Sequence, residues 1–180
     1  MIAKPLSQIE TERLLLRPVT ANDAPEIYSK WGSSAIVAKY MSWKCGIPAE
    51  TEKFLRYAET AWNTGEEYTW VIALKSAPKD LIGSFGIRVR ADDADFGYLL
   101  MPEFWGRGYI AEAGQPIIDW CWKLPHIKRI WAVHHADNPN SGRVMRKLGL
   151  GLESICKNNK IYPQISDTIL QDECLYSIVK

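Results

Sequence analysis

Apolar and polar positions along the chain follow two periods, and the period changes several times. A run with strand character at residues 12–20 precedes helical patterns at 21–31 and 47–65. The second helical pattern begins near Pro48 and ends at Gly65, which fits proline and glycine preferences at helix ends. Its expected buried stripe consists of Phe54, Leu55, Ala58 and Trp62.

The middle of the chain is β-rich. Short runs at 68–75, 81–90 and 95–101 are separated by segments of turn residues, which predicts an antiparallel meander. A helical stripe then covers residues 109–124. The following strand, within 128–137, is apolar on both faces at its start, as is typical of a buried parallel strand.

The C-terminal part adds a short helix at 139–149 and two strands at 152–157 and 173–179. The whole order predicts an α/β fold of the α+β kind, with a mixed central sheet of about six to seven strands. We expect an antiparallel meander, one β-α-β crossover and about four helices, all in a single domain spanning residues 1–180.

Bulk composition narrows the class of protein. The chain has 180 residues, of which 47% are apolar and 24% charged, so an ordinary globular core is expected. A net charge of +1 argues against a nucleic-acid surface. The N-terminal segment lacks a signal-peptide pattern and no stretch is long enough to cross a membrane, which predicts a cytoplasmic protein. Four scattered cysteines without a Cys-x-x-Cys pair predict reduced thiols and no metal site.

The segment "YLLMPEFWGRGYIAEA" carries the clearest chemical signal. Gly106 and Gly108 flank Arg107 between a strand and a helix. The first amides of a helix lack partners and favour anions, and glycines let the backbone curl around a phosphate. A tight turn that needs glycines for geometry alone explains the pair equally well. The pattern formally matches a Rossmann fingerprint through Ala111, but it follows a meander and no acidic residue lies about 20 positions on.

Three further segments occur together in a fixed order. They are "ETERLLLRPVTANDA", "FGYLLMPEFWGRGYIAEA" and "DNPNSGRVMRKLGL", and the terminal "DECLYSIV" fits with them. In this combination the chain resembles the GNAT superfamily of N-acetyltransferases. The likeness is greatest to the branch that includes ribosomal-protein N-terminal alanine and serine acetyltransferases. It spans nearly the whole chain.

The resemblance implies that acetyl-CoA lies between the strands at 95–101 and 128–137. The backbone of Leu100 and Met101 would then bond the pantetheine, Asn138 would hold its arm, and Ser141 would assist the departing thiolate. For Asn138 and Ser141, ordinary capping of the helix is the alternative. The amides that would receive the pyrophosphate are those of Trp105, Gly106, Arg107, Gly108, Tyr109 and Ile110.

The chain also departs from the family. Met145 stands where many members have a tyrosine acid, and Glu103 replaces a frequent Gln or Arg. The residues leave the identity of the base that deprotonates the amine undecided. The candidates are Asp95, one of His134 and His135, and a relayed water. Strand alternation places the two histidines on opposite faces.

The resulting prediction is an acetyl-CoA-dependent transferase that acetylates a primary amine in a ternary complex, without a metal. The acceptor would be a protein or peptide N-terminus or a small amine, and the enzyme a monomer or homodimer. A non-catalytic acyl-CoA-binding module is the alternative, and a Rossmann-type oxidoreductase is a more distant one.

Overall fold

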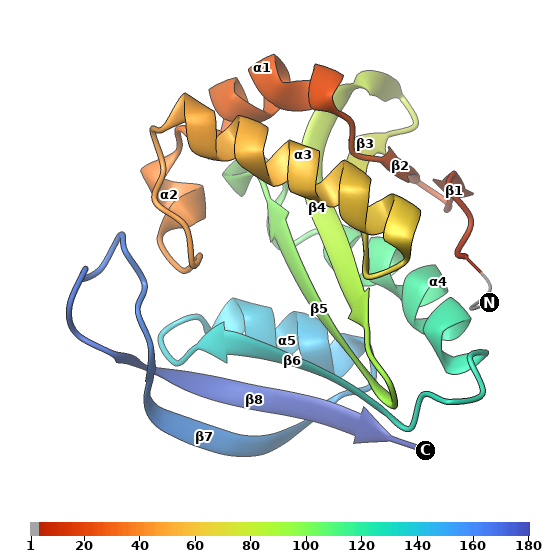
Figure 1. The fold of residues 1–180 in the computed structure, drawn as a ribbon, viewed down its shortest axis with the longest axis vertical. Coiled ribbons are helices and arrows are strands. Elements are labelled where there is room, and N and C mark those ends of the chain that lie inside the picture. The colour runs from red at the N-terminus through yellow and green to blue at the C-terminus, as the bar shows by residue number, and fades with distance from the viewer. Residues whose placement is uncertain (1–3) are drawn as a thin grey trace.

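The computed structural model describes residues 4–180 and contains an eight-stranded sheet in the order β1-β2-β3-β4-β5-β6-β8-β7 (Figure 1). The strands are β1 (Ile9–Glu10), β2 (Leu14–Pro18), β3 (Glu67–Leu74), β4 (Ala77–Val89), β5 (Asp93–Leu100), β6 (Arg129–His135), β7 (Gly151–Lys160) and β8 (Gln171–Val179). The helices are α1 (Ala24–Ile27), α2 (Ala35–Ala38), α3 (Pro48–Thr64), α4 (Tyr109–Trp122) and α5 (Pro139–Lys147).

The sheet is mixed, as the sequence predicts. Strands β2 to β5 form the antiparallel meander, and α4 crosses over to β6, which pairs with β5 in parallel. The predicted α/β class and crossover are confirmed. The strand count is slightly higher than expected because β1 has only two residues, too few to show a periodic pattern. A doubly wound parallel sheet is absent from the described chain, which removes the Rossmann alternative.

The helical pattern at 21–31 is the part that the structure changes most. It forms a 3₁₀ turn at Ala21–Asp23, the short α1, and a π turn at Tyr28–Gly32. The Asp23 carboxylate accepts a hydrogen bond from the Thr20 amide at 2.8 Å, which holds the first turn. The pattern showed where helical backbone would form, but it did not show how tightly each turn is wound.

Helix α3 follows its prediction closely. It begins at Pro48 and ends at Gly65, whose φ of 83° permits its amide to bond the Ala61 carbonyl at 2.9 Å. The buried stripe consists of Leu55, Ala58 and Ala61. Phe54 was wrongly included in the expected stripe, since 41% of it is exposed.

Two apolar clusters lie on opposite faces of the meander. On β3, Trp70 and Ile72 belong to the larger cluster, whereas Val71 between them belongs to the smaller one. The larger cluster includes the stripe of α4, and the smaller one includes residues of α1 and α3. The sheet is therefore covered on both faces, which explains why β3 is apolar without alternation.

Strands β5 and β6 stay paired over a short distance only. Asp93 to Asp95 pair with Arg129 to Trp131, and beyond that point the two strands diverge (Figure 1). β5 continues along β4 as far as Leu100, and β6 continues along β8 as far as His135. The divergence leaves one edge of each strand facing open space. Within residues 4–180, no helix is both long and apolar enough to span a membrane.

Candidate active site

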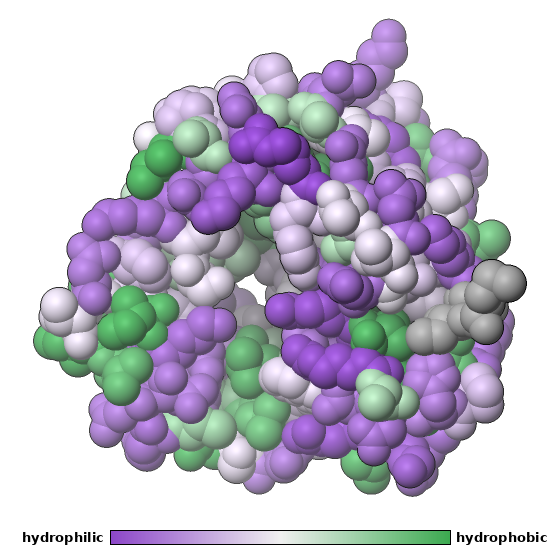
Figure 2. Space-filling view, viewed as in Figure 1, coloured by the Kyte–Doolittle hydropathy of each residue, from purple (hydrophilic) through white to green (hydrophobic). Residues whose placement is uncertain are grey.

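A cavity of about 1330 Å³ occupies the space where β5 and β6 diverge. Its walls come from both strands, from the first turns of α4 and α5, from α2, and from residues 39–42 that follow α2. The space-filling view shows a hollow near the middle of this face (Figure 2). Most of the residues predicted for the site therefore meet here, although they come from distant parts of the chain.

The loop before α4 offers a continuous run of free amides. Gly106 and Gly108 have φ angles of 77° and 80°, which few residues other than glycine adopt without strain. In the described chain, the amides of residues 106–111 make no hydrogen bond with protein groups. The Trp105 amide was expected to belong to this run, but it donates to the Pro102 carbonyl at 3.1 Å. The run begins one residue later than predicted, and its free donors and the helix dipole suit an anion.

Arg107 itself contributes backbone to this run and not a cavity wall. Its side chain is exposed, and its guanidinium lies 5.9 Å from the centre of the Phe104 ring. Its carbonyl accepts a hydrogen bond from Arg13 Nη2 at 3.1 Å. The loop is therefore tied to the N-terminal segment through its backbone.

Glu112 completes this tie. Its Oε1 accepts the Arg13 amide at 2.8 Å and the Thr11 hydroxyl, and its Oε2 accepts Arg13 Nε at 2.7 Å. Burial raises the pKa of Glu112, but the hydrogen bonds from Thr11 and Arg13 outweigh it and hold the pKa below 4.5. The carboxylate thus holds the start of α4 to the N-terminal segment.

The open edge of β5 accounts for only one of the two predicted backbone contacts. The Met101 amide donates to the Ile82 carbonyl at 2.8 Å, so it is committed to β4 and is not a donor for a ligand. Neighbouring residues of a strand point their backbone groups to opposite sides, so those of Leu100 face the diverging edge. There the Leu100 carbonyl already accepts Trp105 Nε1 at 2.7 Å. The Leu100 amide remains as the donor on that edge.

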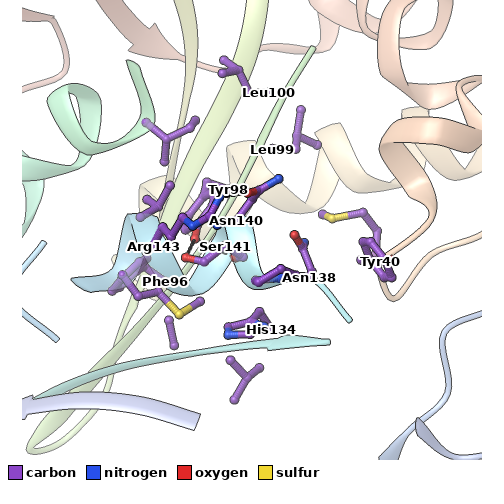
Figure 3. A pocket seen from close by; sticks show the side chains of 18 of the residues that line it. Tyr40, Phe96, Tyr98, Leu99, Leu100, His134, Asn138, Asn140, Ser141 and Arg143 are labelled. Carbon is purple, nitrogen blue, oxygen red and sulfur yellow. Dashed lines mark hydrogen bonds between the residues drawn. The ribbon is translucent and has the colours of Figure 1, made fainter. Parts of the chain in front are cut away.

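Asn138 and Ser141 lie at the start of α5, on the other side of the divergence. Asn138 occupies the N-cap position, yet its side chain makes no capping bond. The Ser141 hydroxyl lies 2.7 Å from the Tyr98 hydroxyl of β5, and Tyr98 also donates to the Ser141 carbonyl at 2.9 Å (Figure 3). Neither side chain acts as a cap, so both are available to the cavity that they line.

Tyr98 is a site residue that the sequence interpretation missed. Burial raises the pKa of its phenol above the ordinary 10.0, and the Ser141 hydrogen bond only partly opposes this, so the hydroxyl stays protonated at neutral pH. Met145 is buried and provides no hydroxyl, as expected. Alternation along β5 places Tyr98 on the same face as Phe96 and Leu100, but only the packing of α5 shows that Ser141 meets it.

Of the two histidines, His134 lines the cavity and His135 does not. His134 Nδ1 lies 2.7 Å from the His135 carbonyl, so it donates, which leaves Nε2 unprotonated and without a partner. Burial lowers the pKa of His134 despite this hydrogen bond. His135, the predicted catalytic candidate, lies with its ring against Tyr40 and Tyr162, and its Nδ1 accepts the Asp137 amide at 3.0 Å.

Asp95 lines the cavity from the paired part of β5. It is buried, and its carboxylate makes ion pairs with Arg90 and, at 3.2 Å, with Arg88. Both oxygens are occupied by guanidinium groups. Two guanidinium groups stabilise the ionised carboxylate and make it a weaker proton acceptor, so this arrangement favours a structural role for Asp95 over the predicted role of base.

A second buried carboxylate, Glu173 of β8, also lines the cavity and was not predicted. It accepts hydrogen bonds from the Tyr162 hydroxyl and the Asn159 side chain. Of the described residues that line the cavity, none is a cysteine. The searched residues 4–180 hold no group of three or more potential metal ligands.

Comparisons with known proteins agree with this geometry. Residues 13–151 match the family model described as an acetyltransferase (GNAT) domain. The uncharacterized N-acetyltransferase YoaA of Bacillus subtilis is 26% identical over 175 residues, 96% of each chain.

Two solved structures show the same fold. One is the microcin C7 self-immunity acetyltransferase MccE in complex with acetyl-CoA and AMP (TM-score 0.84, 19% identity, 100% of both chains). The other, from Salmonella typhimurium, modifies the N-terminal serine of ribosomal protein L7/L12 (TM-score 0.81, 18% identity, 94% of this chain and 96% of that one).

Proposed function

The chain belongs to the GNAT acetyltransferase family, and on this premise we propose that it acetylates a primary amine by direct attack in a ternary complex. Acetyl-CoA is the cosubstrate of this N-acetyltransferase family and supplies the acetyl group as an activated thioester.

One observation supports the proposal: the same cavity is lined by a run of free backbone amides at residues 106–111, which we call the anion cradle, and by the paired hydroxyls of Ser141 and Tyr98. The free amides of residues 106–111 suit the pyrophosphate of acetyl-CoA, because they supply several donors at a positive helix end. An added Cβ at Gly106 meets nothing within 4 Å, so the approach to this backbone is open. The Leu100 amide and the Asn138 side chain are the donors assigned to the pantetheine arm.

The hydroxyls of Ser141 and Tyr98 are assigned to proton transfer to the sulfur of CoA. When the amine nitrogen bonds the acetyl carbon and the carbon–sulfur bond breaks, Ser141 donates its proton to the thiolate. Tyr98, at 2.7 Å from Ser141 Oγ, then returns a proton to Ser141. The proton that the attacking nitrogen loses on becoming an amide passes through water to the Tyr98 oxygen, so the products are the thiol and the neutral amide and both hydroxyls are restored. Direct attack is supported by the lining itself, since no described wall residue is a cysteine that would carry a covalent acetyl group.

For the acceptor we propose the N-terminal amine of a protein or peptide, or a small molecule with a primary amine. Likeness to an enzyme that modifies an N-terminal serine supports the first, but fold alone is weak support for a substrate. The four free cysteines fit work in a reducing compartment such as the cytoplasm.

The test is acetyl transfer followed by mass spectrometry. The purified protein is mixed with acetyl-CoA and a panel of N-terminal peptides, polyamines, amino sugars and amino acids. We expect one class to gain a single acetyl group, and the Ser141→Ala variant to form the same product more slowly. Confirmed acetyl-CoA binding without transfer to any amine would contradict the proposal.

A further inference from the structure

Three carboxylates are buried in the described chain, and one of them has no cation. Asp23 pairs with Arg17, and Asp95 pairs with two arginines. Glu173 is the most buried, with 2% exposed, yet within residues 4–180 it makes no ion pair. Its donors are neutral: the Tyr162 hydroxyl at 2.6 Å from Oε1, and the Asn159 amide on Oε2. Burial of a charge without a counter-ion is unfavourable, so this arrangement needs a reason.

The surroundings of Glu173 are aromatic and face the cavity. Tyr40 and Tyr162 both line the cavity, and each packs on the ring of His135 with centroids 4.8 Å apart. His135 accepts the Asp137 amide at Nδ1. The Tyr162 hydroxyl contacts the carboxylate directly, and Tyr40 lies on His135, the residue paired with Glu173 across the two strands. This part of the cavity wall therefore provides π faces and hydroxyls, groups that surround a cation well.

The Tyr40 ring already shows that an ammonium can reach it. Lys39 Nζ lies over this ring, 5.0 Å from its centroid. Lys160 also lines the cavity, but its side chain is exposed and makes no ion pair with Glu173 in the described chain. No lysine within residues 4–180 thus neutralises the carboxylate, and the cavity is the side from which a cation can approach.

We propose that Glu173, Tyr162 and Tyr40 form the subsite that receives the ammonium group of the amine acceptor. The inference rests on the proposed function and assigns a place to its second substrate. In Figure 3, Tyr40 lies across the cavity from Ser141 and Tyr98, with Asn138 between them, and Glu173 and Tyr162 line the same cavity. The bound ammonium loses one proton to water before its nitrogen attacks the thioester. The acetylated product is a neutral amide, so it lacks the attraction to Glu173 and is released.

The decisive variant is Glu173→Gln, which removes the charge and keeps the shape. The glutamine oxygen can accept the Tyr162 hydroxyl, and Asn159 can turn its amide to bond the glutamine nitrogen. We expect KM for the best acceptor of the panel to rise about 30-fold or more, because a buried charge pair loses one partner. The Kd for acetyl-CoA should stay within about twofold.

A second readout does not depend on turnover. Without ligand, loss of an uncompensated buried charge should raise Tm by about 2–4 °C. Ethylammonium chloride should shift the ring resonances of Tyr40 and Tyr162 in the wild type and not in Glu173→Gln. Asp172→Asn is the matched control, since its half-buried carboxylate is neutralised by Lys157 at 2.6 Å and also accepts the Asn158 amide. It should leave KM unchanged and should not raise Tm.

The outcomes separate this inference from the proposed function. If Glu173→Gln lowers Tm and leaves KM unchanged, the carboxylate is only a structural acceptor and the inference is wrong. If the wild type acetylates no amine but binds ethylammonium through Glu173, the proposed function fails and the cation subsite stands. If Glu173→Gln does not fold, Tyr40→Leu replaces it, with an expected threefold or larger rise in acceptor KM. An unchanged KM in that variant would overturn the inference.

Discussion

Replacement of Asn138 by alanine separates binding from folding, because its side chain sits at a helix N-cap without capping. An N-cap side chain that bonds its helix contributes about 0.5–2 kcal/mol to the free energy of unfolding. In a protein of this size, loss of about 1 kcal/mol lowers Tm by about 2–4 °C. The Asn138 side chain makes no such bond, so we expect a change below about 0.5 kcal/mol and nearly constant Tm.

The effect on acetyl-CoA should be larger. If the Asn138 amide bonds the pantetheine arm, its loss removes about 0.5–1.5 kcal/mol of binding free energy. At 1.4 kcal/mol per tenfold change, the Kd for acetyl-CoA should rise about 2- to 13-fold. Isothermal titration calorimetry measures this Kd, and a thermal melt of the same sample measures Tm.

The matched control is Ser34→Ala. Ser34 Oγ accepts the Val37 amide at 3.4 Å at the start of α2, so it is a side chain that does cap. This variant should lose stability and keep the Kd for acetyl-CoA. If Asn138→Ala instead lowers Tm by about 2–4 °C and leaves the Kd unchanged, the residue is a cap and its assignment to the cofactor is wrong.

Three other substitutions test the site from different sides. Gly108→Val should weaken acetyl-CoA binding at least tenfold by calorimetry, because φ is 80° and a branched side chain would cover the free amides; an unchanged Kd would contradict the cradle. Tyr98→Phe should lower kcat about tenfold or more at constant KM for acetyl-CoA. Burial raises the Tyr98 pKa above 10.0, so the pH profile of wild-type kcat should show no Tyr98 titration below pH 10. Glu112→Gln should lower Tm at pH 7. Hydrogen bonds from Thr11 and Arg13 outweigh burial and hold the Glu112 pKa below 4.5, so the carboxylate's contribution to stability is present above pH 4.5 and disappears as pH falls further. Thermal melts of the variant and the wild type should therefore converge in acid.

Local sequence features predicted the elements well where local energetics dominate. Pro48 and Gly65 delimit α3 because a proline fits the first helical turn and a glycine adopts positive φ after the last. The pattern at 21–31 was less informative, since its division into 3₁₀, α and π turns follows packing against the rest of the fold. Trp31 illustrates this: it lies in the π turn and is buried in the smaller core cluster.

The structure places most of the predicted loop residues at the cavity, whereas the partners of the strand residues could not be predicted. Glycine spacing located the free amides near residues 106–111, because unpaired donors at a helix start are a local property. The backbone partner of Met101 depends on where β4 ends, and the arginines on Asp95 come from other positions of the meander. Such partners are set by strand register, which a single sequence does not display.

The sequence by itself determined the order of elements, the glycine loop and the motif order that indicates the family. These features rest on interactions between neighbouring residues, or on spacing along the chain. Only the tertiary structure brought Tyr98 to Ser141, turned His134 and not His135 to the cavity, and buried Glu173 without a cation. Those placements depend on how far β5 and β6 diverge and on which face α5 packs against, and both are settled by the packing of the complete sheet.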